Sequence, residues 1–341
     1  MLDIFNADAF SVVRLTQVIN DLKHKPSRIA ELGLFDEESQ DTTKVSIEKK
    51  GEILVLVPPT PRGGPGITID KEKRDLRILN VPHFEINDAV YAEEVQNVRA
   101  LGQEAALETV AAKVSNRLVT HVNSHAVTEE YSRMGAIKGV VTYADNSTLD
   151  LFAEFGVSAE ATVAFDLAAA SPADGVLREK CAGITRKVAD ILGGLPFTGL
   201  HAFCGDNFFD SLLKFKEVRD TYKGWNEATI LRDSYIGPNR SSYGIFQFGG
   251  IVFENYRGNV NGTAFIGTDE CQIFPLGVPG LFKSVRSPAD YIETVNTMGE
   301  RLYAKQYRMP NDKGVHLDSQ TNSLHYCSRP KALIKGVRTT V

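Results

Sequence analysis

The sequence lacks the marks of secretion, of a membrane span and of a disulfide framework. Its four cysteines, Cys181, Cys204, Cys271 and Cys327, are widely spaced, and none belongs to a Cys-x-x-Cys pair. Disulfide-stapled domains are short and dense in cysteine, so we expect four reduced thiols. No stretch approaches the ~20 consecutive apolar residues of a membrane helix, and no basic segment followed by an apolar run opens the chain. We therefore expect neither a signal peptide nor a membrane partner.

An excess of basic charge is also missing. The 341 residues include 38 Lys and Arg against 43 Asp and Glu, which gives a formal net charge of -5. A protein dedicated to gripping nucleic acid usually carries a basic excess or a basic face, and neither is present. The hydrophobic fraction of 43% and the charged fraction of 24% are typical of a folded chain, and the length suggests about two domains.

Motifs that carry catalysis or bind phosphate are absent as well. No Gly-Lys dipeptide occurs, so the phosphate loop that ends in Gly-Lys and a hydroxyl residue is excluded. No Gly-x-Ser-x-Gly nucleophile elbow occurs either. Asp269 and Glu270 are adjacent carboxylates, which we interpret as solvated turn residues. We predict no catalytic residue and no cofactor-binding residue.

Two histidines offer the best candidate for a metal site. His121 and His125 stand four residues apart on a predicted helix, so their rings could share a face. A zincin needs Glu directly after the first His, and Val122 stands there. Our interpretation is a polar edge of the helix, with no metal ligand predicted. The alternative hypothesis is a cytosolic metal-dependent enzyme that uses this pair.

Residues 1–41 are predicted to form an N-terminal arm. Short apolar clusters at 12–19 and 31–35 are interrupted by Pro26, and the acidic run 36–38 ends the segment. Such a segment cannot bury much apolar surface alone. It either lies as a strap on its own domain or orders against neighbouring subunits.

Residues 42–84 are predicted to form an extended β-hairpin loop. Val45 and Ile47 alternate with polar residues, and Leu76, Ile78 and Asn80 would share one face of the returning strand. Between the strands the Pro- and Gly-rich stretch 58–66 must be a loop. Two strands with so few apolar positions are marginal alone, so we expect the hairpin to lie on something else, such as another subunit.

A helix of unusual length is predicted at about 103–138. Apolar residues recur there at three- and four-residue steps, proline is absent, and Gly139 ends the pattern. Such a helix spans roughly 50 Å and predicts a spine for an elongated body. A hairpin turning at Asp145 and Asn146 follows. A second helix is predicted with Ser171 as N-cap, Pro172 at its first position and Gly193 after its end.

From about residue 196 the pattern changes to short strands, turns and one short helix at 206–215, with many aromatic residues. We predict a second domain of α+β type whose last strands return to the first domain. In the helix before this domain, Cys181 belongs to the apolar stripe and is predicted to be a core residue.

Several ordered segments between 200 and 337 resemble the lambda-type major head protein family, often called major capsid protein E. They are FCGDNFFDSLL at 203–213, FQFGGIVFENYRG at 246–258, FPLGVPGLF at 274–282, SPADYIETVNTMG at 287–299, and shorter matches at 303–306, 319–324 and 329–336. The run PSRIAELGLF at 26–35 also resembles the start of such proteins.

This resemblance implies the α+β tailed-phage major capsid fold, which encapsulins and the herpesvirus capsid floor also use. The fold has an N-terminal arm, an extended β-hairpin loop (E-loop), a peripheral domain with a long spine helix, and an axial domain. In this chain we expect them in that order. The expected ranges are 1–41 for the arm, 42–84 for the E-loop, 85–195 for the peripheral domain, 196–299 for the axial domain and 300–341 for C-terminal strands that return to both domains.

The function implied is a shell subunit that forms hexamers and pentamers of an icosahedral phage head around packaged dsDNA. The protein would be part of the virion, assembled in the host cytoplasm. Because no helical block of about a hundred residues precedes the arm, we expect a separate scaffolding protein. A maturation protease, a portal and a decoration protein are further expected partners, with DNA nearby through non-specific proximity. An encapsulin-like nanocompartment shell is the nearest alternative.

Overall fold

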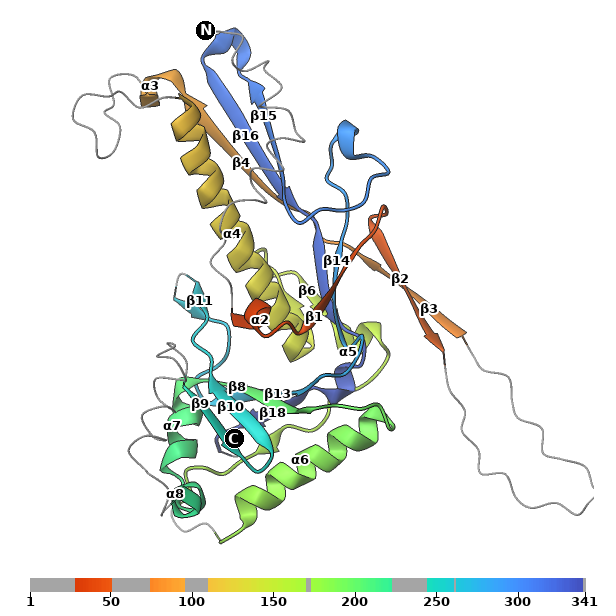
Figure 1. The fold of residues 1–341 in the computed structure, drawn as a ribbon, viewed down its shortest axis with the longest axis vertical. Helices are drawn as coiled ribbons and strands as arrows, with labels where there is room; N and C mark the ends of the chain where they lie inside the picture. Colours follow the sequence, from red (N-terminus) through yellow and green to blue (C-terminus); the bar gives the residue numbers. More distant parts are fainter. Residues whose placement is uncertain are drawn as a thin grey trace, which may run out of the picture.

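The computed structural model describes residues 28–50, 74–95, 110–169, 173–222, 244–260 and 262–339. The molecule is elongated, with two bodies along its long axis (Figure 1). One body is built on a six-stranded sheet, and the other on the long helix α4 (Val110–Lys138) with a three-stranded sheet beside it. The predicted mixture of helices and sheets is confirmed.

The six-stranded sheet has the order β7-β18-β13-β8-β10-β9. Its members are β7 (Val163–Ala164), β18 (Ile334–Val337), β13 (Glu270–Leu276), β8 (Gly199–Cys204), β10 (Ile251–Asn255) and β9 (Ile245–Phe248). Because side chains alternate across a strand, Ala202 and Cys204 of β8 face one core while Phe203 faces another. The sheet is therefore buried on both faces.

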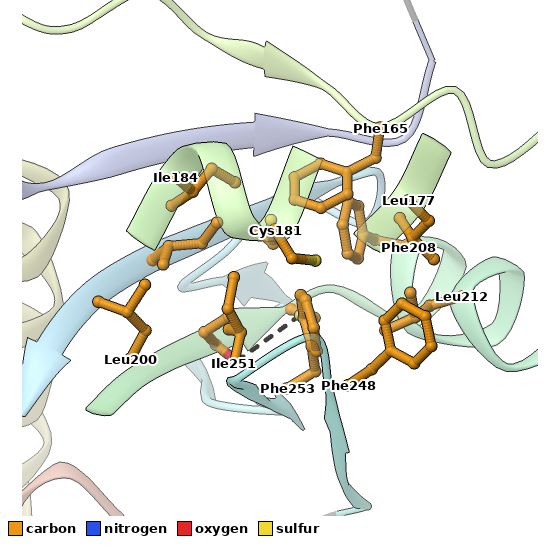
Figure 2. Close-up of a cluster of buried hydrophobic side chains, with 14 of the residues drawn as sticks. Phe165, Leu177, Cys181, Ile184, Leu200, Phe208, Leu212, Phe248, Ile251 and Phe253 are labelled. Carbon is orange, nitrogen blue, oxygen red and sulfur yellow. Dashed lines mark hydrogen bonds between the residues drawn. The ribbon is translucent and has the colours of Figure 1, made fainter. Parts of the chain in front are cut away.

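One face of this sheet is covered by α6 (Val176–Leu192) and α7 (Asp206–Lys214), beside which lies α8 (Lys216–Tyr222). Figure 2 shows Leu177 of α6 beside Phe208 and Ile184 on the side of Leu200, all within one cluster. Cys181 is fully buried, as predicted. Gly193, with a φ of 62°, ends α6 as expected for a left-handed C-cap.

The predicted start of α6 is wrong. Ser171 and Pro172 lie outside the described residues, and the helix begins only at Val176, after Gly175. Its first free N–H groups need acceptors, and these come from far along the chain. The Glu217 carboxylate of α8 accepts from the backbone N–H of Leu177 at 3.1 Å and of Arg178 at 3.3 Å. A distant acid thus replaces the local cap that the sequence suggested.

Helix α4 confirms the predicted long helix through Lys138, while 103–109 lies outside the described residues. The predicted apolar positions from Val114 to Ile137 are buried. The first half packs on the three-stranded sheet of β15 (Tyr303–Arg308), β16 (Gly314–Thr321) and β4 (Phe84–Tyr91), after which the short helix α3 (Ala92–Val95) follows. The last turns pack on the second face of the six-stranded sheet.

Short elements connect the two bodies. The predicted hairpin after Gly139 is present as β5 (Val140–Thr142) and β6 (Thr148–Asp150), with Asn146 at a φ of 64° in its turn. Asp150 then caps α5 (Leu151–Glu154). A second short two-stranded ribbon is formed by β11 (Asn259–Val260) and β12 (Thr263–Ala264).

A third sheet has the order β1-β14-β17, formed by β1 (Phe35–Ser39), β14 (Phe282–Arg286) and β17 (Ser323–Cys327). The acidic run that was expected to end the arm lies in β1, which pairs in parallel with β14. The 3-10 turns η4 (Ile292–Thr294), η5 (Pro310–Asp312) and η6 (Pro330–Ala332) lie between the last strands. The C-terminal strands pair with both bodies, because β16 pairs with β4 and β18 pairs with β13.

Candidate assembly surfaces

The most prominent projection is the hairpin of β2 (Lys44–Lys50) and β3 (Arg74–Asn80), seen in red and orange in Figure 1. The strands pair from Lys44 opposite Asn80 to Lys50 opposite Arg74. At the root, Val45 and Leu79 are buried in the body. Ile78, on the face predicted for Leu76 and Asn80, is 57% exposed. The Pro- and Gly-rich loop predicted at 58–66 lies outside the described residues.

The segment before this hairpin is held to the six-stranded sheet by a buried ion pair. The short helix α2 (Arg28–Glu31) places Arg28 against Glu254 of β10, with Nη2 donating to Oε2 at 2.8 Å and Nε donating to Oε1. His201 Nε2 lies 3.1 Å from the same Oε2. Burial opposes ionisation of Glu254, but the hydrogen bonds from Arg28 and His201 outweigh it and lower the pKa of this carboxyl.

The same segment is also held to α4. The backbone N–H of Ile29 and the hydroxyl of Tyr256 donate to Glu130 Oε1 at 3.1 and 2.8 Å. Ile29 itself is fully buried. The described chain thus begins at a junction that ties both bodies together.

A charge network crosses the middle of α4 and reaches the third sheet. Arg286 of β14 donates to Glu129 Oε1 at 2.9 Å and to Glu37 Oε1 of β1 at 3.2 Å. Arg133 also reaches Glu37, and Arg301 reaches Glu129. Burial opposes ionisation of Glu129, but Arg286 and Arg301 more than offset it and lower its pKa to about 2. Strand β1 is therefore fixed to α4 by charge as well as by its ladder.

The two histidines of the metal-site hypothesis are hydrogen-bonded inside the fold. His121 Nδ1 and His125 Nε2 each lie 3.0 Å from the hydroxyl oxygen of Ser319 in β16, and His121 Nε2 lies 3.4 Å from Asp88 Oδ2. Both rings are buried against β16 and do not lie at a polar edge of the helix, so that interpretation was wrong. Burial lowers the pKa of His121, and burial with the neighbouring His121 lowers that of His125 to about 4. In the described part of the chain no group of three potential ligands gathers for a metal ion.

The remaining candidates for chemistry have structural roles. Asp269 pairs with Arg338 at 2.6 Å, and Glu270 pairs with Lys335 at 2.6 Å, so these carboxylates are not simply solvated. All four cysteines are free and buried, as the prediction of reduced thiols requires. Burial raises the pKa of Cys181 and Cys327 to about 12, so neither is a ready nucleophile.

A hollow on the surface lies beside α4. A groove of about 830 Å³ runs between α4, the β5–β6 turn, the start of β4 and the β11–β12 ribbon. Phe84, Tyr131, Tyr143 and Phe265 line it together with Val127.

No helix in the described ranges combines the length and apolar content needed to cross a bilayer.

Three features of the structure were not predicted from the sequence. These are the strand β1, the buried Glu129–Arg286 pair, and the apolar residues that the loop 287–299 exposes. The signal for β1 was present in the run from Phe35 to Glu38, but its partner strand lies almost 250 residues away. Loop 287–299 was noticed only as a family-like motif.

Comparison with known proteins agrees with this architecture. The family model described as phage major capsid protein E matches residues 11–338. The major capsid protein of Pseudomonas phage KPP10 is 27% identical over 323 residues, covering 90% of each chain. That of Salmonella phage Felix O1 is 23% identical over 364 residues, covering 98% of each.

Solved structures share the fold at low sequence identity. A capsid protein structure from a prophage of E. coli CFT073 has a TM-score of 0.60 at 12% identity and covers 97% of this chain and 100% of its own. The capsid of cyanophage P-SCSP1u has a TM-score of 0.53 at 13% identity, with 94% and 90% covered. Because the family model spans nearly the whole sequence and the fold agrees, this chain belongs to the phage major capsid protein E family.

Proposed function

We propose that this chain, a structural subunit of a phage head shell and not an enzyme, assembles into hexamers and pentamers that close an icosahedral shell around packaged dsDNA. The observation that carries this proposal is the β2–β3 hairpin. It leaves the body at a root held by Val45 and Leu79, while Ile78 on β3 is exposed. A two-stranded excursion of this kind gains stability by lying on another surface, and a shell of identical copies supplies one.

The hairpin would lie across an adjacent subunit. Deleting residues 58–72 and closing the strands with a short Gly-Ser turn should leave the thermal unfolding of the monomer near that of the wild type, because Val45 and Leu79 keep their contacts. Closed shells should be lost in electron micrographs. Replacing 58–72 by a Gly-Ser segment of equal length is the matched control for chain connectivity. Normal shells from the deletion would refute this role of the hairpin.

The domain ranges are also a proposal. The body around α4 would be the peripheral domain, and the six-stranded sheet the axial domain. A boundary at 195 would separate α6 from the sheet whose core it completes with Leu177, Cys181 and Ile184. This packing favours a boundary near residue 160, with α6 in the axial domain.

The partners follow from the shell function. We expect a separate scaffolding protein, a maturation protease and a portal, with a decoration protein as a further partner, and assembly in the host cytoplasm. A formal net charge of -5 does not favour a dedicated grip on DNA, so we expect only non-specific proximity to it.

Electron microscopy with sedimentation, on the chain expressed alone and together with the scaffolding protein of its phage, tests assembly directly. Closed shells, tubes or rings of five or six subunits are expected. A monomer or dimer, both alone and with the scaffolding protein, would refute the shell function. Mass analysis of purified particles separates the alternatives, because a phage head holds DNA and an encapsulin-like shell holds a protein cargo.

A further inference from the structure

Residues 287–299, here called the crest, expose three large apolar side chains on one short loop. Ile292 is 91% exposed, Val295 63% and Met298 59%. In the described part of the chain the other large exposed apolar residues are spread over β3, β4, α4 and β15. Isolated exposed apolar residues are ordinary, whereas a cluster marks an interaction site.

The crest is held rigidly. The Thr294 hydroxyl donates to the backbone oxygen of Ala289 at 2.7 Å, and the Thr297 hydroxyl donates to that of Thr294 at 2.8 Å. At the end of the loop, a Cβ on Gly299 would lie 2.4 Å from the backbone oxygen of Arg286, so only glycine fits there. The exposed apolar residues therefore do not belong to a loose segment that could fold them inward.

The underside of the crest is polar where it meets the sheet of β15 and β16. Gln320 Oε1 accepts from the backbone N–H of Asp290 at 3.0 Å, and Asn322 Nδ2 donates to the backbone oxygen of Pro288 at 2.7 Å. Tyr291 and Tyr303 pack together beneath the loop. The crest is thus fixed to the sheet by these hydrogen bonds and by the buried contact of Tyr291 with Tyr303, while Ile292, Val295 and Met298 are exposed.

The charge on the crest is partly neutralised. Lys305 Nζ lies 2.8 and 3.0 Å from the two carboxylate oxygens of Glu293 and sits 5.2 Å from the centre of the Tyr291 ring. Asp290, the other acidic residue of the crest, is exposed and forms no ion pair with the described part of the chain. Lys305 thus compensates one of the two carboxylates of the crest.

The crest also adjoins the root of the projecting hairpin. Its Gly299 N–H donates to the backbone oxygen of Gln40 at 2.9 Å, just before β2. Figure 1 shows the loop that carries η4, drawn in blue after β14, on the same side of the molecule as the root of β2–β3. The crest thus adjoins the segment that leads into the hairpin proposed to reach a neighbouring subunit.

We propose that the crest packs against the crest of a neighbouring copy, around a local symmetry axis of the shell. This inference rests on the proposed shell function. Three side chains bury far less area than the ~1,200–2,000 Å² of a stable interface, so the contact cannot hold a dimer in solution. Repeated around closed symmetry it adds to the other contacts of each subunit, and like surfaces meet where a symmetry axis brings identical parts together.

A cysteine placed on the crest tests this geometry. All four native cysteines are buried, so Val295→Cys adds a thiol that oxidant and a short bismaleimide can reach. In assembled shells we expect covalent dimers, and mass spectrometry should identify a link between residue 295 of one copy and residue 295 of another. Val119→Cys, on the exposed side of α4, is the matched control and should give few dimers. Shells of Val295→Cys that stay monomeric under both reagents, or that link no better than the control, would overturn the proposal.

Polar substitutions provide the second test. The triple variant Ile292→Ser, Val295→Ser, Met298→Ser should unfold at the wild-type temperature, because these side chains are exposed in the monomer. Its yield of closed shells should fall by about tenfold or more, since an apolar contact repeated many times is lost. Val119→Ser with Val127→Ser on α4 is the matched control.

The outcomes separate the two proposals. If the wild-type chain forms no shells with its scaffolding protein, the shell function fails. If wild-type shells form and the triple variant forms them equally well, the crest contact fails and the shell function stands.

Discussion

The two bodies of the molecule are stabilised by different physics. Beneath α6, the six-stranded sheet buries a continuous apolar cluster that includes Phe165, Phe208 and Phe253. In the other body, the middle of α4 buries charged and polar side chains, among them Glu129 and Arg133. The first interior depends on apolar burial and close packing. The second depends on geometry, because each buried charge costs free energy unless its partner stays in place.

This difference predicts how each body responds to change. An apolar core loses stability gradually as atoms are removed, and it is insensitive to pH. A buried charge network tolerates replacement of both partners better than loss of one, and it responds to protonation. In a shell subunit, the body around α4 would therefore be the one whose packing depends on solution conditions.

The largest expected effect is in the apolar core. Phe208 is fully buried, with ring centroids 5.2 Å from Phe165 and 6.4 Å from Phe253. Phe208→Ala should lower the free energy of unfolding by about 3–5 kcal/mol, because it leaves a cavity among aromatic rings. Chemical denaturation followed by circular dichroism measures it, and Phe208→Leu should cost less. A loss below about 1 kcal/mol would show that this core is loosely packed.

Breaking the charge network should cost nearly as much. Glu129→Leu leaves Arg286 and Arg301 without their buried carboxylate, and we expect a loss of about 3 kcal/mol in the free energy of unfolding. The double variant Glu129→Leu with Arg286→Met should recover much of this loss, because no buried charge is then left unpaired. If the single and the double variant are equally unstable, packing and not charge stabilises this part of α4.

Local patterns allowed much of this architecture to be predicted. Gly139 and Gly193 end helices as expected, and the turn at Asn146 lies where the sequence placed it, because these features depend on a few neighbouring residues. The start of α6 could not be found in this way, since its N–H groups bond to Glu217 and not to a local cap. The pairing of β1 with β14 was equally hidden, because strand partners distant in sequence leave no local pattern.

The candidate surfaces also differ in whether local sequence predicts them. The hairpin was predictable because alternating residues and a Pro- and Gly-rich loop specify it locally. The apolar exposure of Ile292 was not, since sequence alone cannot tell which side of a loop faces the body. For the same reason His121 and His125 were expected at a polar edge, although β16 covers them.

Acid should weaken the body around α4 first. Burial lowers the pKa of His125 to about 4 and that of His325 to about 3, so both rings are neutral in the fold at pH values where the unfolded chain binds protons. Stability should therefore fall as the pH drops from about 6.5 toward 4, by up to about 1.4 kcal/mol per pH unit for each ring. Urea midpoints across this range measure the slope. The double variant His125→Asn, His325→Asn should be flatter, and an unchanged slope would mean that the rings are already protonated in the fold.

The smallest expected effect lies on β18 and β13 of the six-stranded sheet, where charge is exposed. Lys335 Nζ and Glu270 Oε1 are 2.6 Å apart across β18 and β13, but both side chains are more than one-third exposed. Water and salt screen such a pair, so Lys335→Met should change the free energy of unfolding by no more than about 0.2–1 kcal/mol. Thermal unfolding at low and high salt should show little difference between the variant and the wild type. A loss as large as that of Glu129→Leu would mean that charge stabilises both bodies alike, and the contrast between them would then rest on apolar packing alone.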